Sequence, residues 1–504
     1  MRFGRKKTRK KQKNVGKKDL KSQELLTIEN VKSQLNHTDD LKEREIHISS
    51  QIYTILYIDS LTDQEKLESK VIEPLTKSET NDIVSQLYSQ EISSISNTEE
   101  AANGLLEGNC LLLKKEKPQE GLLLKVAATT DRDITEPVAE KTVLGAHAGF
   151  VESLDKNIYL LRKLVETPGF TVKNYTLGSE TTTDVGLIYV DHLANQDIIK
   201  KVDQRLKSIS LDSIHSVGDI QDCIEDQTYS PFPQILVTER PDRTAANLKD
   251  GKVGLVIDGS SAVLIVPATF MVFFQSPDDY VNRWGLGSFL RIVRLFSYII
   301  ALVLPAFYIA VVSYHYEFLP LELVYSMQSS LSYVPFKPII ELIALQFSLE
   351  LLREASVRLP PSVASTFGIV GGLVVGTAMV EAGLVSYAGL IVVAITAVSS
   401  FIQPNIEMSN TIRFMGFPLM VLAGIFGFLG IITGLLFILI HLSRLTSFGV
   451  PYFSPFAPLN ILEFKDTVIR APVWMRGKYP KMSSRYRRRK MSREWKLYES
   501  EDTY

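Results

Sequence analysis

Several long apolar runs in the second half of this 504-residue chain limit what it can fold into. The clearest run, residues 292–314, carries no charged residue after Arg294. A second run, residues 414–442, contains no Asp, Glu, Lys or Arg. A helix needs about 20 mostly apolar residues to cross a hydrocarbon core about 30 Å thick. These runs predict a membrane domain, preceded by about 290 residues of water-soluble composition.

The number of crossings depends on the segments between those runs. Residues 366–402 hold one charged residue, Glu381, and end in the apolar segment 388–402, which is short for a span unless protein covers its ends. We count four crossings, and segments 318–335 and 337–358 could change that number. The expected last helix is a single long one that starts at Arg413, with glycines 424, 427, 430 and 434 on its packing face.

Basic residues gather at both ends of the chain. Residues 1–21 hold eleven Lys or Arg against one acidic residue, and residues 470–496 hold another eleven against one. The plain interpretation is a pair of solvated tails, and the alternative is attraction to anionic lipid at about 1 kcal/mol per basic residue. Nucleic acid is not an expected partner, because few aromatic residues lie among the basic ones.

Charge and cysteine content predict the orientation in the membrane. No apolar signal segment follows the basic start, and the two cysteines, Cys110 and Cys223, do not suggest a disulfide framework. Three arginines stand at the start of the first apolar run, at positions 283, 291 and 294. The positive-inside rule then predicts a multi-pass protein of the cell membrane with a cytoplasmic N-terminal region, both ends inside and an even number of crossings.

The composition predicts a two-lobed α/β or α+β region followed by an α-helical multi-pass membrane domain. The expected divisions are a disordered basic tail at 1–45, cytoplasmic lobes at 46–290, membrane helices at 291–445 and a basic cytoplasmic tail at 446–504. Residues 52–58 read as a strand, and 109–113 with 121–126 read as a strand pair.

The second expected lobe has clear local signals. Helices are predicted at 154–164 and 195–209, with Asn195 as the cap of the latter. Asp258 and Gly259 form a turn signal, so the strands on either side should pair as a hairpin. The short buried strands expected here are 185–190, 234–237, 254–257 and 262–266.

We find no motif for catalysis, a metal or a cofactor in the sequence, and we expect no enzyme activity. Phosphate loops, zinc-ligand spacings and the nucleophile elbow are missing. The cluster of Asp131, Arg132 and Asp133 is better explained as a solvated turn than as an acid–base pair. Cys223 lies near acidic residues that would raise its pKa, which does not suit a nucleophile.

Two stripes on the helix expected near residues 366–381 suggest a pore. Gly368, Gly372 and Gly376 recur every four residues, a spacing that lets another backbone approach, either within one subunit or between subunits. The opposite stripe is apolar, then hydroxyl, then acidic, and its members are Val370, Val374, Thr377 and Glu381. Facing an axis, the valines would form a constriction that can dewet, and the carboxylate would disfavour anions.

The segment 337–358 is amphipathic and carries many charges. Its charged stripe comprises Glu341, Glu350, Arg353, Glu354 and Arg358. Oppositely charged residues three or four apart lie next to each other on a helix, which predicts contacts from Glu350 to Arg353 and from Glu354 to Arg358. These charges exclude full exposure to lipid and favour an interfacial or inter-subunit helix over a re-entrant or shielded spanning one.

Several stretches resemble the A subunit of the GerA-type spore germination receptors. They include GFVESLDKNIYLLRK at 149–163, LELLREASVRLP at 349–360, STFGIVGGLVVGTAMVEAGLVS at 365–386 and SFGVPYFSPFAP at 447–458. The resemblance implies a permease-like B subunit that binds the germinant and a lipoprotein C subunit as partners. It also implies a homo-oligomeric cation channel, a pentamer being one form, in the spore inner membrane. A non-conducting scaffold and an auxiliary channel like the stage V sporulation AF protein remain alternatives.

Overall fold

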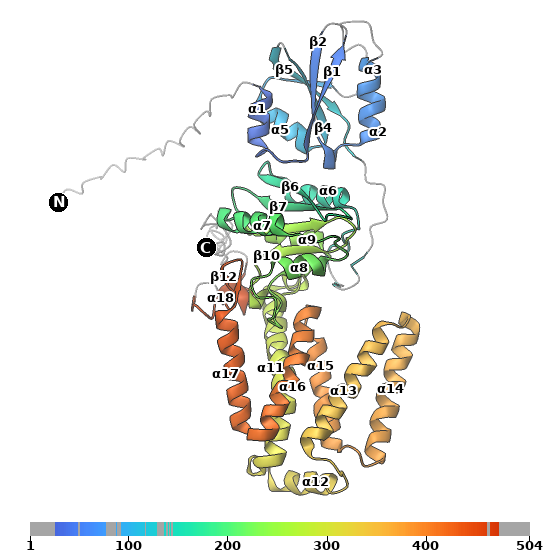
Figure 1. Cartoon of the computed structure of the whole chain (residues 1–504), viewed down its shortest axis with the longest axis vertical. Helices are drawn as coiled ribbons and strands as arrows, with labels where there is room; N and C mark the ends of the chain where they lie inside the picture. The colour runs from blue at the N-terminus through green and yellow to red at the C-terminus, as the bar shows by residue number, and fades with distance from the viewer. Residues whose placement is uncertain are drawn as a thin grey trace, which may run out of the picture. The chain divides into compact units, whose positions relative to one another are not determined.

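The structure is a computed structural model of the chain, shown in Figure 1. It divides into two compact units, Met1–Asp131 with Glu166–Thr171, and Arg132–Val165 with Val172–Tyr504. Most of both predicted basic tails lies outside the described part. The residues that the structure describes are 26–48, 51–76, 87, 92–115, 117–128, 136–137, 140, 142, 145–460 and 464–472.

The first unit is built on a five-stranded antiparallel sheet with strand order β1-β2-β4-β5-β3. The strand predicted at 52–58 and the predicted pairing of 109–113 with 121–126 are confirmed. Buried aliphatic side chains of β2, β4 and β5 form its core with short helices. Its elements are α1 (Ile28–Gln34), β1 (Leu41–Ile48), β2 (Gln51–Ile58), η1 (Asp59–Leu61), α2 (Gln64–Leu67), η2 (Glu68–Ile72), α3 (Glu73–Thr76), β3 (Ile92–Ile95), α5 (Thr98–Leu106), β4 (Asn109–Lys114) and β5 (Lys117–Lys125).

The folded part begins well before residue 46, where the sequence predicts a disordered tail to end. Helix α1 starts with Thr27 as its cap, whose hydroxyl accepts the Asn30 N–H at 3.2 Å. Strand β1 buries only Ile46 and Ile48 and exposes a run of charged side chains. An edge strand commonly exposes charge, so the apolar pattern that marks a central strand is missing.

The second lobe has another five-stranded sheet, ordered β6-β7-β9-β10-β8. The predicted hairpin is confirmed as β9 with β10, and Asn195 caps α7 by accepting the Asp197 N–H at 3.0 Å. Every residue of β9 and β10 is buried, so these strands are covered on both faces of the sheet. The elements are α6 (Leu154–Val165), β6 (Phe170–Leu177), β7 (Thr183–Val190), α7 (Gln196–Ser208), α8 (Val217–Ile224), β8 (Leu236–Thr238), α9 (Pro241–Lys249), β9 (Val253–Ile257), β10 (Val263–Val266) and η3 (Phe270–Phe274).

A bundle of helices follows this lobe within the second unit. Helix α11 packs along α15 and α16, and α14 lies at the edge of the bundle beside α13 (Figure 1). The helices are α10 (Asp278–Val281), α11 (Trp284–Tyr314), η4 (Tyr316–Phe318), α12 (Leu321–Leu331), α13 (Pro338–Val357), α14 (Pro361–Glu381), α15 (Tyr387–Phe401), α16 (Ile406–Phe426) and α17 (Phe428–Arg444). A two-stranded ribbon, β11 (Thr446–Ser447) and β12 (Val450–Pro451), and α18 (Phe464–Thr467) come last.

The prediction of one long last helix is wrong. Gly427 has φ +59° and separates α16 from α17, which pack against each other as a hairpin. Arg413 lies inside α16 and does not begin a helix. The packing role of the other glycines is confirmed, because a Cβ at Gly430 or Gly434 would collide with α16.

Among the described residues, α11 and α16 are long and apolar enough to cross a membrane, and α15 and α17 are apolar but shorter. Helix α15 corresponds to the short apolar segment that the sequence predicts at 388–402. Helix α13, for which the sequence favours an interfacial or inter-subunit position, packs against α14, α15, α11 and α16. Its charged residues therefore meet protein partners rather than only a membrane surface.

Candidate functional site

A buried ion cluster ties the second lobe to the start of α11. The Asp279 carboxylate, on α10, has no exposed surface and accepts hydrogen bonds from Arg291 Nε at 3.0 Å and Arg294 Nη1 at 2.8 Å. Arg291 also donates to the Asp466 carbonyl at 2.7 Å. The sequence marks both arginines as orientation signals, and the structure adds that they hold one shared carboxylate.

The residues after α17 are inserted into the core of the second lobe. Phe448 is 2% exposed, and its ring lies under the Arg205 guanidinium, 4.7 Å from the ring centre. The Ser447 hydroxyl donates to the Gln234 carbonyl at 2.7 Å and accepts the Ala268 N–H at 3.0 Å. The segment that follows the last helix is thus part of the lobe.

The loop between α8 and β8 contacts the last two helices. The Thr411 hydroxyl of α16 donates to the Pro231 carbonyl at 2.6 Å, and the Ser230 hydroxyl lies 2.8 Å from His441 Nε2 of α17. Together with the ion cluster and the inserted segment, this loop makes a continuous junction. The second lobe and the helices therefore share direct hydrogen bonds within this unit.

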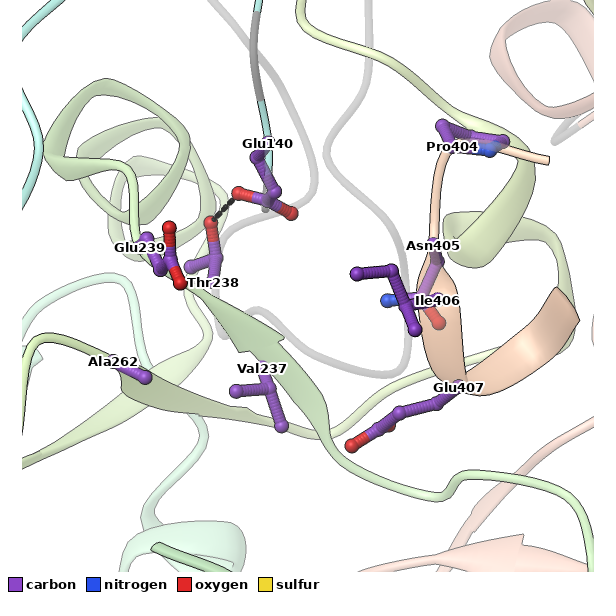
Figure 2. Close-up of a pocket in the computed structure, with 9 residues that line it drawn as sticks. All are labelled: Glu140, Val237, Thr238, Glu239, Ala262, Pro404, Asn405, Ile406 and Glu407. Atoms are coloured by element: carbon purple, nitrogen blue, oxygen red, sulfur yellow. Dashed lines mark hydrogen bonds between the residues drawn. The ribbon is translucent and has the colours of Figure 1, made fainter. Parts of the chain in front are cut away.

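A small pocket lies in this junction, between the edge strand β8 and the start of α16 (Figure 2). Its volume is about 130 Å³, well below the ~300 Å³ at which small-molecule sites begin. It has room for a few water molecules, a small ion or a molecule of a few heavy atoms. Its lining residues are Glu140, Val237, Thr238, Glu239, Ala262, Pro404, Asn405, Ile406 and Glu407.

The acidic lining of the pocket is partly neutralised. The Glu140 carboxylate pairs with Arg243 at 2.5 Å and accepts the Thr238 hydroxyl, as Figure 2 shows for the latter. The Glu407 side chain extends from α16 toward β8, and its buried Oε2 has no hydrogen-bond partner among the described residues. Nowhere in the described ranges do three or more His, Cys, Asp or Glu side chains group so that they could hold a metal ion.

The charged stripe of α13 pairs differently from the sequence prediction in one respect. Glu354 does meet Arg358, at 2.6 Å on an exposed surface. Glu350, however, forms an ion pair with Arg413 of α16, and not with Arg353. The Arg353 guanidinium instead lies over the Phe401 ring, 3.9 Å from its centre.

Glu341, at the other end of α13, is buried at 1% exposure against the start of α15. Its Oε1 accepts the Ser386 N–H at 2.7 Å and the Ser386 hydroxyl at 2.6 Å. Tyr308 of α11 lies within hydrogen-bond distance of the same hydroxyl, 3.2 Å away. An ionised carboxylate at the N-terminus of a helix is favoured by the unpaired N–H groups and the helix dipole. Sequence reasoning placed Glu341 on the charged stripe but did not find this partner.

The predicted glycine stripe is largely uncovered within the chain. A Cβ built on Gly368 or Gly372 meets none of the described atoms within 4 Å, whereas one on Gly376 meets Leu390 of α15 at 3.6 Å. Close packing inside one chain therefore accounts for Gly376 and not for the other two.

The predicted pore stripe is also open to its surroundings where it is described. Val374 is 55% exposed, and Thr377 and Glu381 are exposed as well. The side chain of Val370 lies outside what the structure describes. Helix α14 thus presents two uncovered faces, one of glycines and one of the candidate pore residues.

The possible catalytic residues gain no support from the geometry. Asp131, Arg132 and Asp133 lie outside the described residues. Cys223 is exposed, and partial burial of the thiol together with Asp222 raises its pKa. The acidic setting predicted for Cys223 is confirmed, and it disfavours the thiolate.

Comparison with known proteins gives a match over nearly the whole chain. The family described as Bacillus/Clostridium GerA spore germination protein matches residues 29–482. The uncharacterized membrane protein YfkQ of Bacillus subtilis (strain 168) is 38% identical over 438 residues, covering 86% of this chain and 85% of its own length. Spore germination protein KA of the same organism is 35% identical over 469 residues, with 91% and 86% covered.

A relative from another species and a solved structure extend the match. Spore germination protein GerLA of Bacillus cereus is 34% identical over 455 residues, covering 88% of this chain and 92% of its own length. The crystal structure of the N-terminal domain of the A subunit of the Bacillus megaterium spore germinant receptor GerK3 is 29% identical. It covers 48% of this chain and 92% of that chain, with a TM-score of 0.37.

Proposed function

Since the chain belongs to the GerA family of spore germination proteins, we propose that it is the membrane subunit of a nutrient-responsive receptor and forms a cation channel as an oligomer. The observation that carries the channel proposal is α14, whose glycine face and pore-residue face are both uncovered in a single chain. A helix with two such faces fits a ring in which each subunit contacts its neighbour and lines a shared axis.

The proposed topology has six crossings, made by α11 and α13 to α17, in place of the four counted from sequence. These helices run side by side in alternating directions (Figure 1). An even number returns the chain to the side where it started, which agrees with basic residues at both ends and a cytoplasmic second lobe. The basic tails would then face anionic lipid of the cytoplasmic leaflet. Helix α13 can cross because protein groups meet its inner charges: Arg413 of α16 pairs with Glu350, and α15 contacts Arg353 and Glu341.

The proposed trigger is a partner subunit that binds the nutrient. The pocket at the junction is below the usual volume of a small-molecule site, so we place nutrient recognition outside it. Because the chain resembles A subunits, we expect a permease-like B subunit and a lipoprotein C subunit as its partners. The second lobe is bonded to α11, α16 and α17 at the junction. A partner that binds either the lobe or the helices would therefore affect the position of the helices.

Gly372→Leu is expected to disrupt oligomer assembly, because a Leu side chain prevents close approach of a neighbouring backbone at that face. Within one chain the added side chain meets open space, so the subunit itself should still fold. Size-exclusion chromatography with light scattering on the purified protein measures the effect. The matched control is Gly285→Leu, which also has open space around it but lies at the start of α11. Oligomers of unchanged size in both variants would show that this stripe is not a subunit interface.

Val374→Ala is expected to produce a leaky channel and germination without nutrient, since a smaller side chain widens and wets an apolar constriction. Glu381→Gln should lower cation preference with little effect on assembly. Recording from the purified protein in planar bilayers measures both changes. The control is Val398→Ala, an equally conservative change at a position that is 60% exposed on α15, outside the proposed pore helix.

The outcome separates the alternatives. Wild-type and Val374→Ala proteins that both form oligomers but never conduct would favour a non-conducting scaffold that passes a signal to another channel. Conduction without any need for nutrient or for the partner subunits would favour an auxiliary channel of the stage V sporulation AF type. Conduction that Val374→Ala leaves unchanged would move the pore to a different helix.

A further inference from the structure

We propose that the loop between α8 and β8 binds the lipid headgroup layer through Tyr229, so that the second lobe rests on the membrane as well as on the helices. This proposal depends on the membrane position of the helices and not on channel activity. Tyr229 is fully exposed, at 104% of its reference area, although it is a large aromatic residue. It stands at the third position of a turn that the Ser230 N–H closes by donating to the Gln227 carbonyl at 3.1 Å.

The loop holds Tyr229 in a fixed position on its tip. On the lobe side, the Gln234 side chain accepts the Gln227 N–H at 3.0 Å and donates to the Gln227 carbonyl at 2.6 Å. On the helix side, Ser230 and Pro231 contact α17 and α16 as described above. With both flanks bonded, the backbone at Tyr229 is already ordered, so binding costs little backbone entropy.

The helix contacts fix the depth of the loop in the membrane. His441 lies three residues before the end of α17, and Thr411 lies five residues after the start of α16. At 1.5 Å per residue these positions are about 4.5 Å and 7.5 Å inside the helix ends. Helix α17 has 17 residues. Its length is therefore about 25 Å, shorter than a hydrocarbon core of about 30 Å. The core boundary must come close to its ends, which places the loop in the interfacial layer.

The side chains near Thr411 and His441, the two residues that contact the loop, are of the kinds found at a membrane interface. Phe414 on α16 and Ile440 on α17 are 62% and 42% exposed, within one turn of the contact residues. Arg444 is exposed one turn further toward the lobe, at the level of lipid phosphates. Tyrosine is enriched at this level, because its ring enters the acyl boundary while its hydroxyl stays with water and headgroups. Tyr229 directly precedes the two residues that contact these helices, Ser230 and Pro231, and we assign lipid as its partner.

A fluorescent label at position 229 tests the assignment. In a Cys223→Ser background, Tyr229→Cys is labelled with the environment-sensitive dye NBD, and the full chain is reconstituted in vesicles of phosphatidylcholine and phosphatidylglycerol. Cys110 is fully buried and stays unlabelled. We expect blue-shifted emission and about twofold quenching by lipids that carry a nitroxide near the headgroup, as for an interfacial residue. The matched control is Leu164→Cys, exposed on α6 on the side of the lobe away from the helices (Figure 1).

Each outcome decides the proposal. Lipid quenching at position 229 without quenching at position 164 supports it. A label at 229 that aqueous iodide quenches as strongly as at 164, in vesicles where the helices are protected from protease, overturns it. A blue shift that appears only after a partner subunit is added also overturns it and assigns the loop to a protein interface. Because none of these readouts requires conduction, failure of the channel proposal would leave the result interpretable.

Discussion

Asp279→Ala is expected to destabilise the second unit by about 3–5 kcal/mol, since it leaves buried guanidinium groups without their carboxylate. Asp279 has no exposed surface, and Arg291 and Arg294, its partners, are 3% and 9% exposed. A whole domain is stable by only about 5–15 kcal/mol, so most of the folded protein should be lost. The thermal midpoint of the purified full chain and its level in the membrane measure the change.

Two further variants identify the cause of that loss. Asp278→Ala removes a carboxylate from the neighbouring residue. Asp278 is half-buried and, among the described residues, accepts only a long hydrogen bond, 3.4 Å, from the Ser276 hydroxyl. Its loss should therefore lower the free energy of unfolding by less than about 1 kcal/mol. The triple variant Asp279→Leu, Arg291→Met, Arg294→Met removes the three buried charges and keeps similar volumes, and it leaves only the partly exposed Asp466, 3.6 Å from Arg291 in the unmodified chain. It should be more stable than Asp279→Ala alone if the unpaired charges are the cause. A triple variant that is the least stable of the three would show that the arginines matter through other contacts.

Local signals in the sequence were sufficient for the central strands. Residues 52–58 and 109–113 are dense in Leu and Ile because β2 and β4 are covered on both sides, and short runs of this kind are typical of buried strands. The cap of α7 was predictable for a similar reason, since Asn195 acts on an N–H only two residues away. Strand β1 was not predictable in this way, because it is at a sheet edge and most of its side chains meet water.

The membrane part was less predictable, because lipid removes the contrast between polar and apolar segments on which sequence prediction depends. In water a turn between helices is polar, but Gly427 breaks an apolar stretch with no polar neighbour to mark it. Its positive φ allows the hairpin, and nothing in the one-dimensional pattern separates it from the packing glycines beside it.

The partners of the charged residues on α13 were also only partly predictable from the sequence. Helix periodicity predicts ion pairs between residues three or four apart, so the pair of Glu354 with Arg358 was predictable from the sequence. The partner of Glu350 is Arg413, 63 residues away, and that of Glu341 is Ser386, 45 residues away. Only the packing of α13 against α15 and α16 brings these groups together. The candidate pore stripe of α14, by contrast, is local in sequence and remains a proposal about neighbours that a single chain does not contain.

Glu341→Ala is expected to release the start of α13 from α15, at a cost of about 1–3 kcal/mol for each polar group left unsatisfied. The Ser386 N–H and hydroxyl both donate to this carboxylate in a buried site, where lipid offers no replacement. Because α14 packs mainly on α13, loosening α13 should also weaken the position of α14. The thermal midpoint of the purified chain and the response of spores to nutrient measure the effect.

Three matched variants test whether the bond to Ser386 is responsible. Glu341→Gln keeps an acceptor oxygen and should lose less stability than Glu341→Ala. Glu354→Ala removes a carboxylate from the exposed face of the same helix and should change stability by less than about 0.5 kcal/mol. Gly389→Ala removes no polar group, but its Cβ would collide with the Glu341 carboxylate and push it from Ser386. If Gly389→Ala reproduces the loss seen in Glu341→Ala while Glu354→Ala does not, the carboxylate acts by holding the start of α15. If Gly389→Ala is as stable as the unmodified chain, Glu341 stabilises the bundle in some other way.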